Sequence, residues 1–265
     1  MAKHTYQSAW TVYESAYYTV YPGKQRPAAL HSSFVDSCFD STNEYQSYRD
    51  EFFNGPAKEY LEEARREYDR LGGDGQFGGT DLDTGAALYA LVRKYQPETI
   101  VETGVCNGCS TLFLLLALHE NQTGQLYSID YPFYADESLA EFKSETFDGY
   151  GGAAIPSDRD PGWIIPDDLR TRWTLRLGKA QEELPRLLDE LPPVEFFIHD
   201  SEHSAPCMMM EFELAWTHLA EGGWILSDDI DWNDAWRIFT QVREPHQVGQ
   251  IEPSMGYLRT SLKQH

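Results

Sequence analysis

The 265-residue sequence has few cysteines, few lysines and no long hydrophobic run, and these shortages exclude several classes of protein. The four cysteines, Cys38, Cys106, Cys109 and Cys207, are too few and too scattered for a disulfide framework. No stretch approaches the roughly 18 consecutive apolar residues that a membrane helix needs, and the N-terminus lacks a basic segment followed by an apolar one. We therefore expect a cytoplasmic protein without a membrane partner.

Acidic residues outnumber basic residues by 43 to 21, which gives a formal net charge of −22 at pH 7. Binding through nucleic-acid phosphates requires a basic surface, so the composition excludes nucleic acid as a partner. Only seven of the basic residues are lysine. A low-lysine, acid-rich composition is typical of proteins from concentrated salt and predicts a halophilic source; an ordinary acidic protein is the alternative.

Residues 1–80 are predicted to form an N-terminal helical extension. Residues 1–55 are rich in Tyr, Ser and Phe with weak periodicity, which indicates short helices and loops that cap another unit. A strongly helical run over 57–71 ends at two glycines, and the glycine-rich stretch that continues to Thr80 predicts a linker. The tyrosine-rich start is also a candidate interface for a homo-oligomer.

From Asp81 onward, helical and strand patterns alternate regularly. The expected helices are 84–95, 110–120, 180–190 and 207–219; the expected strands are 99–101, 125–130, 173–177, 194–198 and 224–227, with a turn at 221–223 and two final strands within 247–261. Alternating β and α elements of this length predict an α/β fold with a doubly wound, seven-stranded, mostly parallel sheet. The core domain would span 81–265.

One long stretch interrupts this alternation, between the second and third expected strands. Residues 132–172 contain scattered prolines and the sequence Gly149-Tyr150-Gly151-Gly152. Long insertions at this edge of a sheet are commonly lids or substrate loops. We therefore expect 132–172 to contribute to substrate binding.

Acidic residues stand at the carboxyl ends of the expected strands, where doubly wound sheets bind their ligands. They are Glu102, Asp130, Asp200, Asp228 and Asp229. Acids gathered at one edge repel one another unless a cation, hydroxyl groups or an ammonium group offsets the repulsion. Each alone could be a helix cap or a solvated turn, but their succession at one sheet edge favours a binding site.

The loop after the first strand has the features of a cofactor loop. Gly104 and Gly108 allow close backbone approach, and Ser110 opens the following helix, whose N-terminus favours negative charge. A dinucleotide site is the natural competitor, but Cys106 occupies the position of the second glycine in its Gly-x-Gly-x-x-Gly motif. Asp130 could bind ribose hydroxyls in either kind of site.

Cys106 and Cys109 form a Cys-x-x-Cys pair, which could serve a redox function or be half of a zinc site. The sequence has no second Cys-x-x-Cys or His-x-x-x-His pair to complete four zinc ligands. The intervening Asn107-Gly108 suits a tight loop, which is the interpretation we favour.

Four segments in order resemble the successive motifs of class I S-adenosylmethionine (SAM) dependent methyltransferases. They are TIVETGVCNGCST at 99–111, SID at 128–130, FFIHDSEH at 196–203 and LAEGGWILSDD at 219–229. The resemblance covers about 81–239, with 256–259 similar to the final strand, and is greatest to small-molecule and sugar O-methyltransferases such as macrocin O-methyltransferase. Cephalosporin-hydroxylase-like and catechol O-methyltransferase-like enzymes are more distant in appearance. It implies a Rossmann-like fold and SAM as cofactor.

The resemblance also implies roles for single residues. Glu102 would contact the ammonium group of SAM, Gly104 and Gly108 would line its methionine chain, and Ser110 would meet its carboxylate. Asp130 would hold the ribose, and Ala180 and Gln181 would flank the adenine.

Three of the strand-end acids, Asp200, Asp228 and Asp229, could supply oxygen ligands for Mg²⁺. Metal-dependent members of the resembled family have ligands at these positions, although the third is often Asn, and other members are metal-free. Three residues after Asp200 stands His203, where related enzymes have a proposed base; the alternative is a histidine that caps the next helix. His199 should point to the opposite face of the strand and be structural.

These observations predict a SAM-dependent O-methyltransferase that acts on a small hydroxylated metabolite or sugar with a divalent metal, with Asp200 and His203 as catalytic residues. Two alternatives stay open at this point. One is a non-methylating, hydroxylase-like enzyme that binds a different metal at the same acids. The other is a non-catalytic module that binds SAM or a nucleotide.

Overall fold

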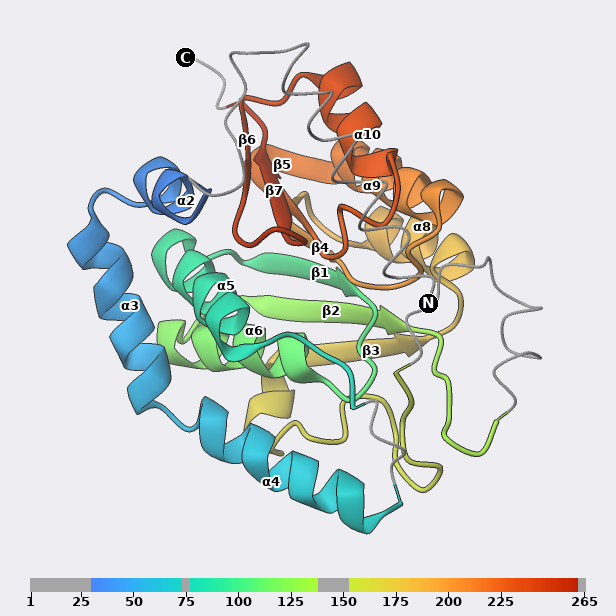
Figure 1. Ribbon diagram of the computed structural model, residues 1–265. Coiled ribbons are helices and arrows are strands. Elements are labelled where there is room, and N and C mark those ends of the chain that lie inside the picture. Colours follow the sequence, from blue (N-terminus) through green and yellow to red (C-terminus); the bar gives the residue numbers. More distant parts are fainter. Residues whose placement is uncertain (1–29, 73–76, 138–152, 262–265) are drawn as a thin grey trace.

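The computed structural model describes residues 30–72, 77–137 and 153–261. In those segments a seven-stranded sheet has the order β3-β2-β1-β4-β5-β7-β6 (Figure 1). The mutually parallel strands are β1 (Thr99–Thr103), β2 (Gln125–Asp130), β3 (Trp173–Leu177), β4 (Val194–His199) and β5 (Leu219–Ser227). β7 (Gly256–Arg259) pairs antiparallel with both β5 and β6 (Gln247–Gln250). The predicted doubly wound, mostly parallel sheet is confirmed.

Helices cover both faces of the sheet (Figure 1). On one face lie α5 (Leu82–Tyr95) and α6 (Cys109–Asn121), and on the other lie α8 (Ala180–Glu190), α9 (Ala205–His218) and α10 (Ala235–Arg243). Successive strand residues supply the two cores alternately, as in β1, where Ile100 packs in the first core and Val101 in the second. This two-sided burial explains why central strands contain short apolar runs, such as Phe196-Phe197-Ile198 in β4.

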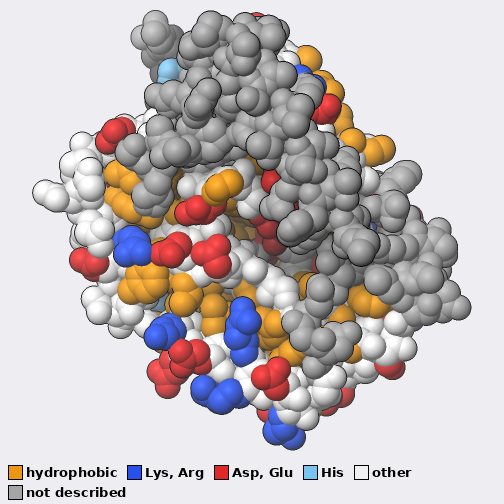
Figure 2. Space-filling view, viewed as in Figure 1, with side chains coloured by type: hydrophobic (Ala, Val, Ile, Leu, Met, Phe, Trp, Pro, Cys, Tyr) orange, Lys and Arg blue, Asp and Glu red, His pale blue; other side chains and the backbone are white. Residues whose placement is uncertain are grey.

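The N-terminal extension is helical where the structure describes it, as predicted. α2 (Leu30–Cys38), α3 (Thr42–Asn54) and α4 (Ala57–Arg70) pack into the same core as α5 and α6. In α4 the buried residues Leu61, Ala64 and Tyr68 recur at helical spacing, and charged side chains of both signs lie over this part of the surface (Figure 2). Residues 1–29, which include most of the tyrosine-rich candidate interface, and 73–76 of the expected linker lie outside the described residues.

Several predicted boundaries require correction. α5 begins at Leu82 because the side chain of Asp81 caps it by accepting from two backbone N–H groups. α9 begins at Ala205, since Ser204 caps it. β4 and β5 each extend beyond their predicted limits, and the turn predicted at 221–223 is an irregular part of β5 with Gly222 at φ +73°.

The insertion at 132–172 is described over 132–137 and 153–172, and its glycine cluster at 149–152 lies outside those ranges. Tyr134 and Ile155 form a β-bridge between the two described parts, and the 3₁₀ helix η2 (Leu169–Arg172) leads into β3. None of the helices in the described part of the chain is both long enough and apolar enough to cross a membrane.

Candidate functional site

A cavity of about 700 Å³ lies at the carboxyl ends of β1 to β5. This volume is in the range of about 300–1,000 Å³ that is usual for small-molecule sites. Ten of the eleven residues predicted for the site line it: Gly104, Gly108, Ser110, Asp130, Ala180, Gln181, Asp200, His203, Asp228 and Asp229. The parallel topology thus brings side chains from five separate segments to one place.

The glycine loop between β1 and α6 has a backbone that requires small residues. Gly104 has φ +86°, and a Cβ atom there would lie 2.0 Å from the carbonyl oxygen of Asp200. Gly108 has φ +102° at the start of α6, and Cys106 also adopts the left-handed conformation, at φ +49°. The loop therefore turns tightly and presents backbone to the cavity, as the sequence predicted.

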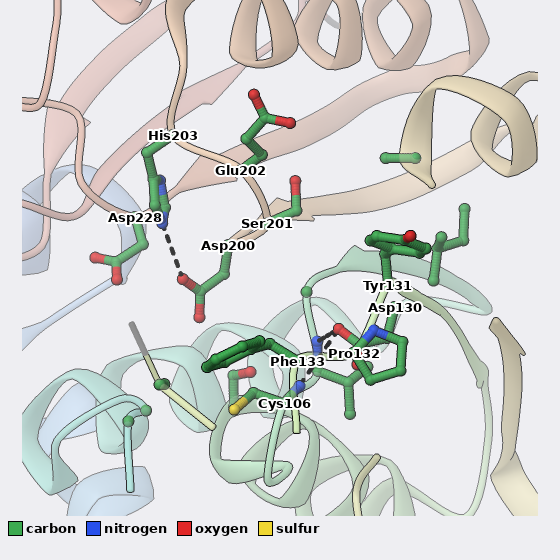
Figure 3. Close-up of a pocket in the computed structure, with 18 of the residues that line it drawn as sticks. Cys106, Asp130, Tyr131, Pro132, Phe133, Asp200, Ser201, Glu202, His203 and Asp228 are labelled. Atoms are coloured by element: carbon green, nitrogen blue, oxygen red, sulfur yellow. Dashed lines mark hydrogen bonds and ion pairs between the residues drawn. The ribbon is translucent and has the colours of Figure 1, made fainter. Parts of the chain in front are cut away.

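Asp130, at the end of β2, has one carboxylate oxygen that accepts hydrogen bonds and one that does not. Its Oδ1 accepts from the backbone N–H groups of Val105, at 3.0 Å, and Cys106, at 3.5 Å (Figure 3). Its Oδ2 is buried and accepts no hydrogen bond. Burial raises the pKa of Asp130 to about 6. The free oxygen is suited to a ligand hydroxyl, which fits the predicted ribose contact.

Glu102 is the one predicted residue that does not line the cavity. It is fully buried behind the glycine loop, where its carboxylate accepts from the hydroxyls of Ser110, at 2.6 Å, and of Thr111 and Ser128, each at 2.8 Å. Burial raises its pKa, against the effect of these three donors. Its contact with a SAM ammonium stays a prediction; the observed bonds tie the loop, α6 and β2 together.

Acids from the ends of β4 and β5 meet on the opposite side of the cavity. Asp200 and Asp228 extend toward the same space, with His203 between them (Figure 3). Burial first, and then the charges of Asp228 and Asp229, raise the pKa of Asp200 well above its usual value. Burial also raises the pKa of Asp228. These carboxylates lie close enough to disfavour simultaneous ionisation unless something compensates their charge.

His203 faces these acids through one ring nitrogen. Its Nε2 lies 3.7 Å from Asp200 Oδ1 and 3.8 Å from Asp229 Oδ2, while its buried Nδ1 has no hydrogen-bond partner. Burial lowers the pKa of His203 to about 3, so its ring is neutral near pH 7. The alternative that His203 caps α9 is wrong, because the cap is the hydroxyl of Ser204.

The acids do not form a closed metal centre. Within the described segments, no group of three or more His, Cys, Asp or Glu side chains is arranged to hold a metal ion. The chemistry of the donors nevertheless fits Mg²⁺, because three carboxylates of two neighbouring strand ends border one cavity, and the charges of Asp228 and Asp229 raise the pKa of Asp200.

The two thiols of the Cys-x-x-Cys pair are neutral. Burial raises the pKa of Cys106, and it raises the pKa of Cys109 to about 12. Because the thiolate is the reactive and metal-binding form, these values disfavour both a redox function and a zinc half-site. Cys106 instead lines the cavity beside the glycine loop.

Some cavity residues were not identified from the sequence. Asn107 is almost fully buried and joins three segments: its amide nitrogen donates to the carbonyls of Phe77 and Ala154, and its oxygen accepts from Trp163. These contacts hold the end of the predicted linker and part of the insertion against the glycine loop. The sequence predicts only a tight loop at this asparagine, because its partners are 30 or more residues away in sequence.

Comparisons with known proteins agree with this geometry. Residues 101–230 match the family described as "Methyltransferase domain". A search of curated proteins gave no match. Similar solved structures include an O-methyltransferase from Bacillus cereus in complex with S-adenosylhomocysteine (SAH), with 16% identity over 77% of this chain and 91% of that one, and a TM-score of 0.52.

Two further solved structures match this chain over a similar share of its length. One is the O-methyltransferase TomG from Streptomyces achromogenes, involved in tomaymycin synthesis and in complex with SAM, with 17% identity, 77% and 90% coverage and a TM-score of 0.50. The other is the SAH-bound methyltransferase PaMTH1 from Podospora anserina, with 17% identity, 78% and 88% coverage and a TM-score of 0.50. At these identities the structures show a common fold. The domain match over residues 101–230 and this common fold support a SAM-dependent methyltransferase.

Proposed function

We propose that the protein transfers the methyl group of SAM to a hydroxyl oxygen of a small hydroxylated metabolite or sugar. The observation that carries the proposal is the position of Asp200 and His203, which border the same cavity as the glycine loop. In this reaction the acceptor oxygen attacks the methyl carbon, the carbon–sulfur bond breaks, SAH leaves, and the hydroxyl proton passes to a base.

The cofactor would lie along the ends of β1, β2 and β3. Asp130 Oδ2 would accept from the ribose hydroxyls, and the glycine loop would line the methionine chain. Ala180 and Gln181, at the start of α8, would flank the adenine. This arrangement leaves the ends of β4 and β5 for the acceptor.

Asp200 is the proton acceptor that these surroundings support best. The pKa of Asp200 is raised toward neutral pH, where a general base is most effective. The pKa of His203 is lowered, which makes that ring a weak base. His203 Nε2 lies 3.7 Å away, just beyond hydrogen-bonding distance, so a small approach would let it orient the carboxylate.

Asp200, Asp228 and Asp229 would hold a divalent cation such as Mg²⁺, which would lower the pKa of the acceptor hydroxyl. The rise in the pKa of Asp200 that Asp228 and Asp229 cause supports the proposal, because a bound cation would relieve this repulsion.

The charge of the cavity restricts the acceptor. In the described residues, five acids and a single lysine line it: Asp130, Asp200, Glu202, Asp228, Asp229 and Lys179. A carboxylate or phosphate on the acceptor would be repelled by these acids. A neutral hydroxylated molecule or a cationic one, such as an amino sugar, is therefore the favoured class.

Purified protein incubated with methyl-labelled SAM and a fractionated metabolite extract tests the proposal. We expect label in a neutral or cationic fraction, and a loss of at least about 100-fold in kcat for Asp200→Asn. Calorimetry with SAH is the companion measurement. Failure to bind SAH would contradict the cofactor assignment, and a fully active Asp200→Asn would contradict the assignment of chemistry to this edge.

Removal of metal tests the cation separately. If Asp200, Asp228 and Asp229 hold Mg²⁺, EDTA should abolish transfer and added Mg²⁺ should restore it. Activity that survives EDTA would instead mean that the acids function by sharing protons. Activity that requires iron and oxygen would support the hydroxylase-like alternative.

A further inference from the structure

A buried glutamate behind the cavity is unused by the mechanism above. Glu211 lies in the middle of α9 and is fully buried, within a helical sequence that is otherwise largely apolar. Burying a carboxylate is costly unless hydrogen bonds compensate for the lost water. Glu211 must therefore be explained by its partners.

Three oxygen and nitrogen donors from two strand ends converge on this carboxylate, and the Cys207 thiol of α9 itself lies 3.6 Å from its Oε1. Its Oε2 accepts from Thr103 Oγ1, at 2.5 Å, and from His199 Nδ1, at 2.7 Å, and its Oε1 accepts from Ser201 Oγ, at 2.7 Å. Burial alone would raise the pKa of Glu211, but the attraction of His199 and these hydrogen bonds hold it below the usual value. The carboxylate is therefore ionised and accepts hydrogen bonds from all three residues.

Each partner is next to, or part of, the cavity wall. Thr103 is the last residue of β1 and precedes Gly104 of the glycine loop, while His199 ends β4 and precedes Asp200. Ser201 lines the cavity itself. One carboxylate thus joins the place where the cofactor loop begins to the place where the proposed base stands.

The two places are also in direct backbone contact. Asp200 N donates to Thr103 O at 2.9 Å, and the Asp200 carbonyl lies so near Gly104 that a Cβ there would be 2.0 Å away. A small displacement of one loop would therefore move the proposed base relative to the methyl donor. In-line displacement is sensitive to such displacements, because about 1 Å of misplacement can reduce the rate by roughly 100-fold.

We infer that Glu211 is a positioning residue for methyl transfer: through Thr103, His199 and Ser201 it fixes the segment 200–203 against the start of the glycine loop. The inference rests on the proposed function, since it takes Asp200 as the group that meets the acceptor. It also assigns a role to His199, which packs its ring against His203 at a centroid distance of 5.3 Å.

The variant Glu211→Gln tests the inference. Its amide group replaces one acceptor oxygen by a donor, so at least one of the three donors loses its partner while the shape is kept. The matched control is Glu213→Gln, two residues along α9, where the glutamate is partly exposed and pairs with Arg243 at the surface. Thr103→Val, which removes a single donor, is a milder second variant for the case that Glu211→Gln does not fold.

Three readouts are compared: kcat for methyl transfer, SAH affinity by calorimetry, and amide hydrogen exchange of 103–105 and 200–203. We expect Glu211→Gln to lower kcat by about 10- to 100-fold, with a much smaller change in SAH affinity and faster exchange at both segments. Thr103→Val should give a smaller effect of the same kind, and Glu213→Gln none.

Two outcomes would overturn the inference. One is an unchanged kcat in Glu211→Gln; the other is a loss of SAH affinity as large as the loss of kcat, which would mean general loosening rather than positioning. If the wild-type protein itself transfers no methyl group, the proposed function fails. Amide hydrogen exchange is then the only readout that tests the role of Glu211. Faster exchange confined to the two segments would then support it, and unchanged exchange would refute it.

Discussion

The carboxylate of Asp130 makes the affinity for cofactor depend on pH. Its pKa is raised to about 6 by burial, so the group is ionised at pH 7 and mostly protonated at pH 5. Only the ionised form leaves both lone pairs of Oδ2 available to ribose hydroxyls. Lowering the pH through 6 should therefore weaken SAH binding, by about tenfold between pH 7 and pH 5 if only the ionised form binds.

Calorimetric titration of SAH at several pH values measures this effect, and Asp130→Asn is its control. The variant should bind more weakly at pH 7, and its affinity should change much less with pH, because the titrating group is gone. If the SAH affinity of the wild-type protein is constant from pH 7 to pH 5, Asp130 does not bind the ribose.

Gly104 should tolerate no side chain, for two separable reasons. Its φ of +86° strains any L residue, and an added Cβ would collide with the backbone carbonyl of Asp200. Gly72 is the matched control, since it has φ +83° but a Cβ there meets nothing within 4 Å among the described residues. We expect Gly72→Ala to cost about 1–2 kcal/mol in unfolding free energy, which is the backbone strain alone.

Gly104→Ala should cost more than Gly72→Ala and should also abolish SAH binding, since the backbone at Asp200 must move. Urea unfolding and calorimetry on both variants measure the difference. Equal losses of stability with SAH binding intact would show that the close approach of the two loops has no consequence.

At the scale of elements, the packing of α5 on α6 depends on one small residue. An added Cβ at Gly85 would lie 2.4 Å from the ring of Phe113, a fully buried residue of α6. Glycine to alanine within a helix normally stabilises by up to about 1 kcal/mol. Here overpacking should dominate, so we expect Gly85→Ala to destabilise by about 1–3 kcal/mol.

A double-mutant cycle with Phe113→Leu tests this cause. The smaller side chain should recover part of the loss from Gly85→Ala, giving a favourable coupling energy in urea unfolding. Strictly additive effects would mean that the ring and the helix backbone do not compete for the same space.

The elements that sequence patterns predicted well are those whose burial is complete or strictly periodic. β1 is buried throughout, α6 contains a long apolar run over 112–118, and α8 repeats its buried leucines at helical spacing, so their existence and type were predictable. The helix α10 was not predicted, because its short sequence mixes aromatic, polar and basic residues. The sequence predicts a turn at the start of β5, because the pair Gly222-Gly223 does not reveal how this segment pairs with β4.

In the candidate site, too, some residues could be predicted from the sequence and others could not. Strand-end residues such as Asp130 and Asp200 were predictable, because topology alone brings the carboxyl ends of parallel strands together. The roles of Asn107 and Glu211 were not, because each depends on partners from segments distant in sequence. The apolar run of α9 contains two glutamates, Glu211 and Glu213, so the sequence marks the pair but does not tell which of them is buried.

At the scale of the whole molecule, charge is the dominant feature. With 43 acidic and 21 basic residues, the net charge of −22 opposes the compact state through self-repulsion. Local pairs such as Arg93–Glu51 and Lys94–Glu44 offset part of this repulsion, but there are not enough bases to pair every acid. Stability should therefore depend on the ions in solution.

We expect the melting temperature to rise with KCl concentration from millimolar to molar values. Added salt shortens the screening length from about 30 Å at 0.01 M to about 3 Å at 1 M, which removes most long-range repulsion between surface carboxylates. Calorimetric melting in a KCl series measures this, and NaCl at equal ionic strength is the control, because screening does not depend on which monovalent cation supplies it. A melting temperature that stays flat would favour an ordinary acidic protein over a halophilic one, and a rise with KCl alone would point to specific cation binding.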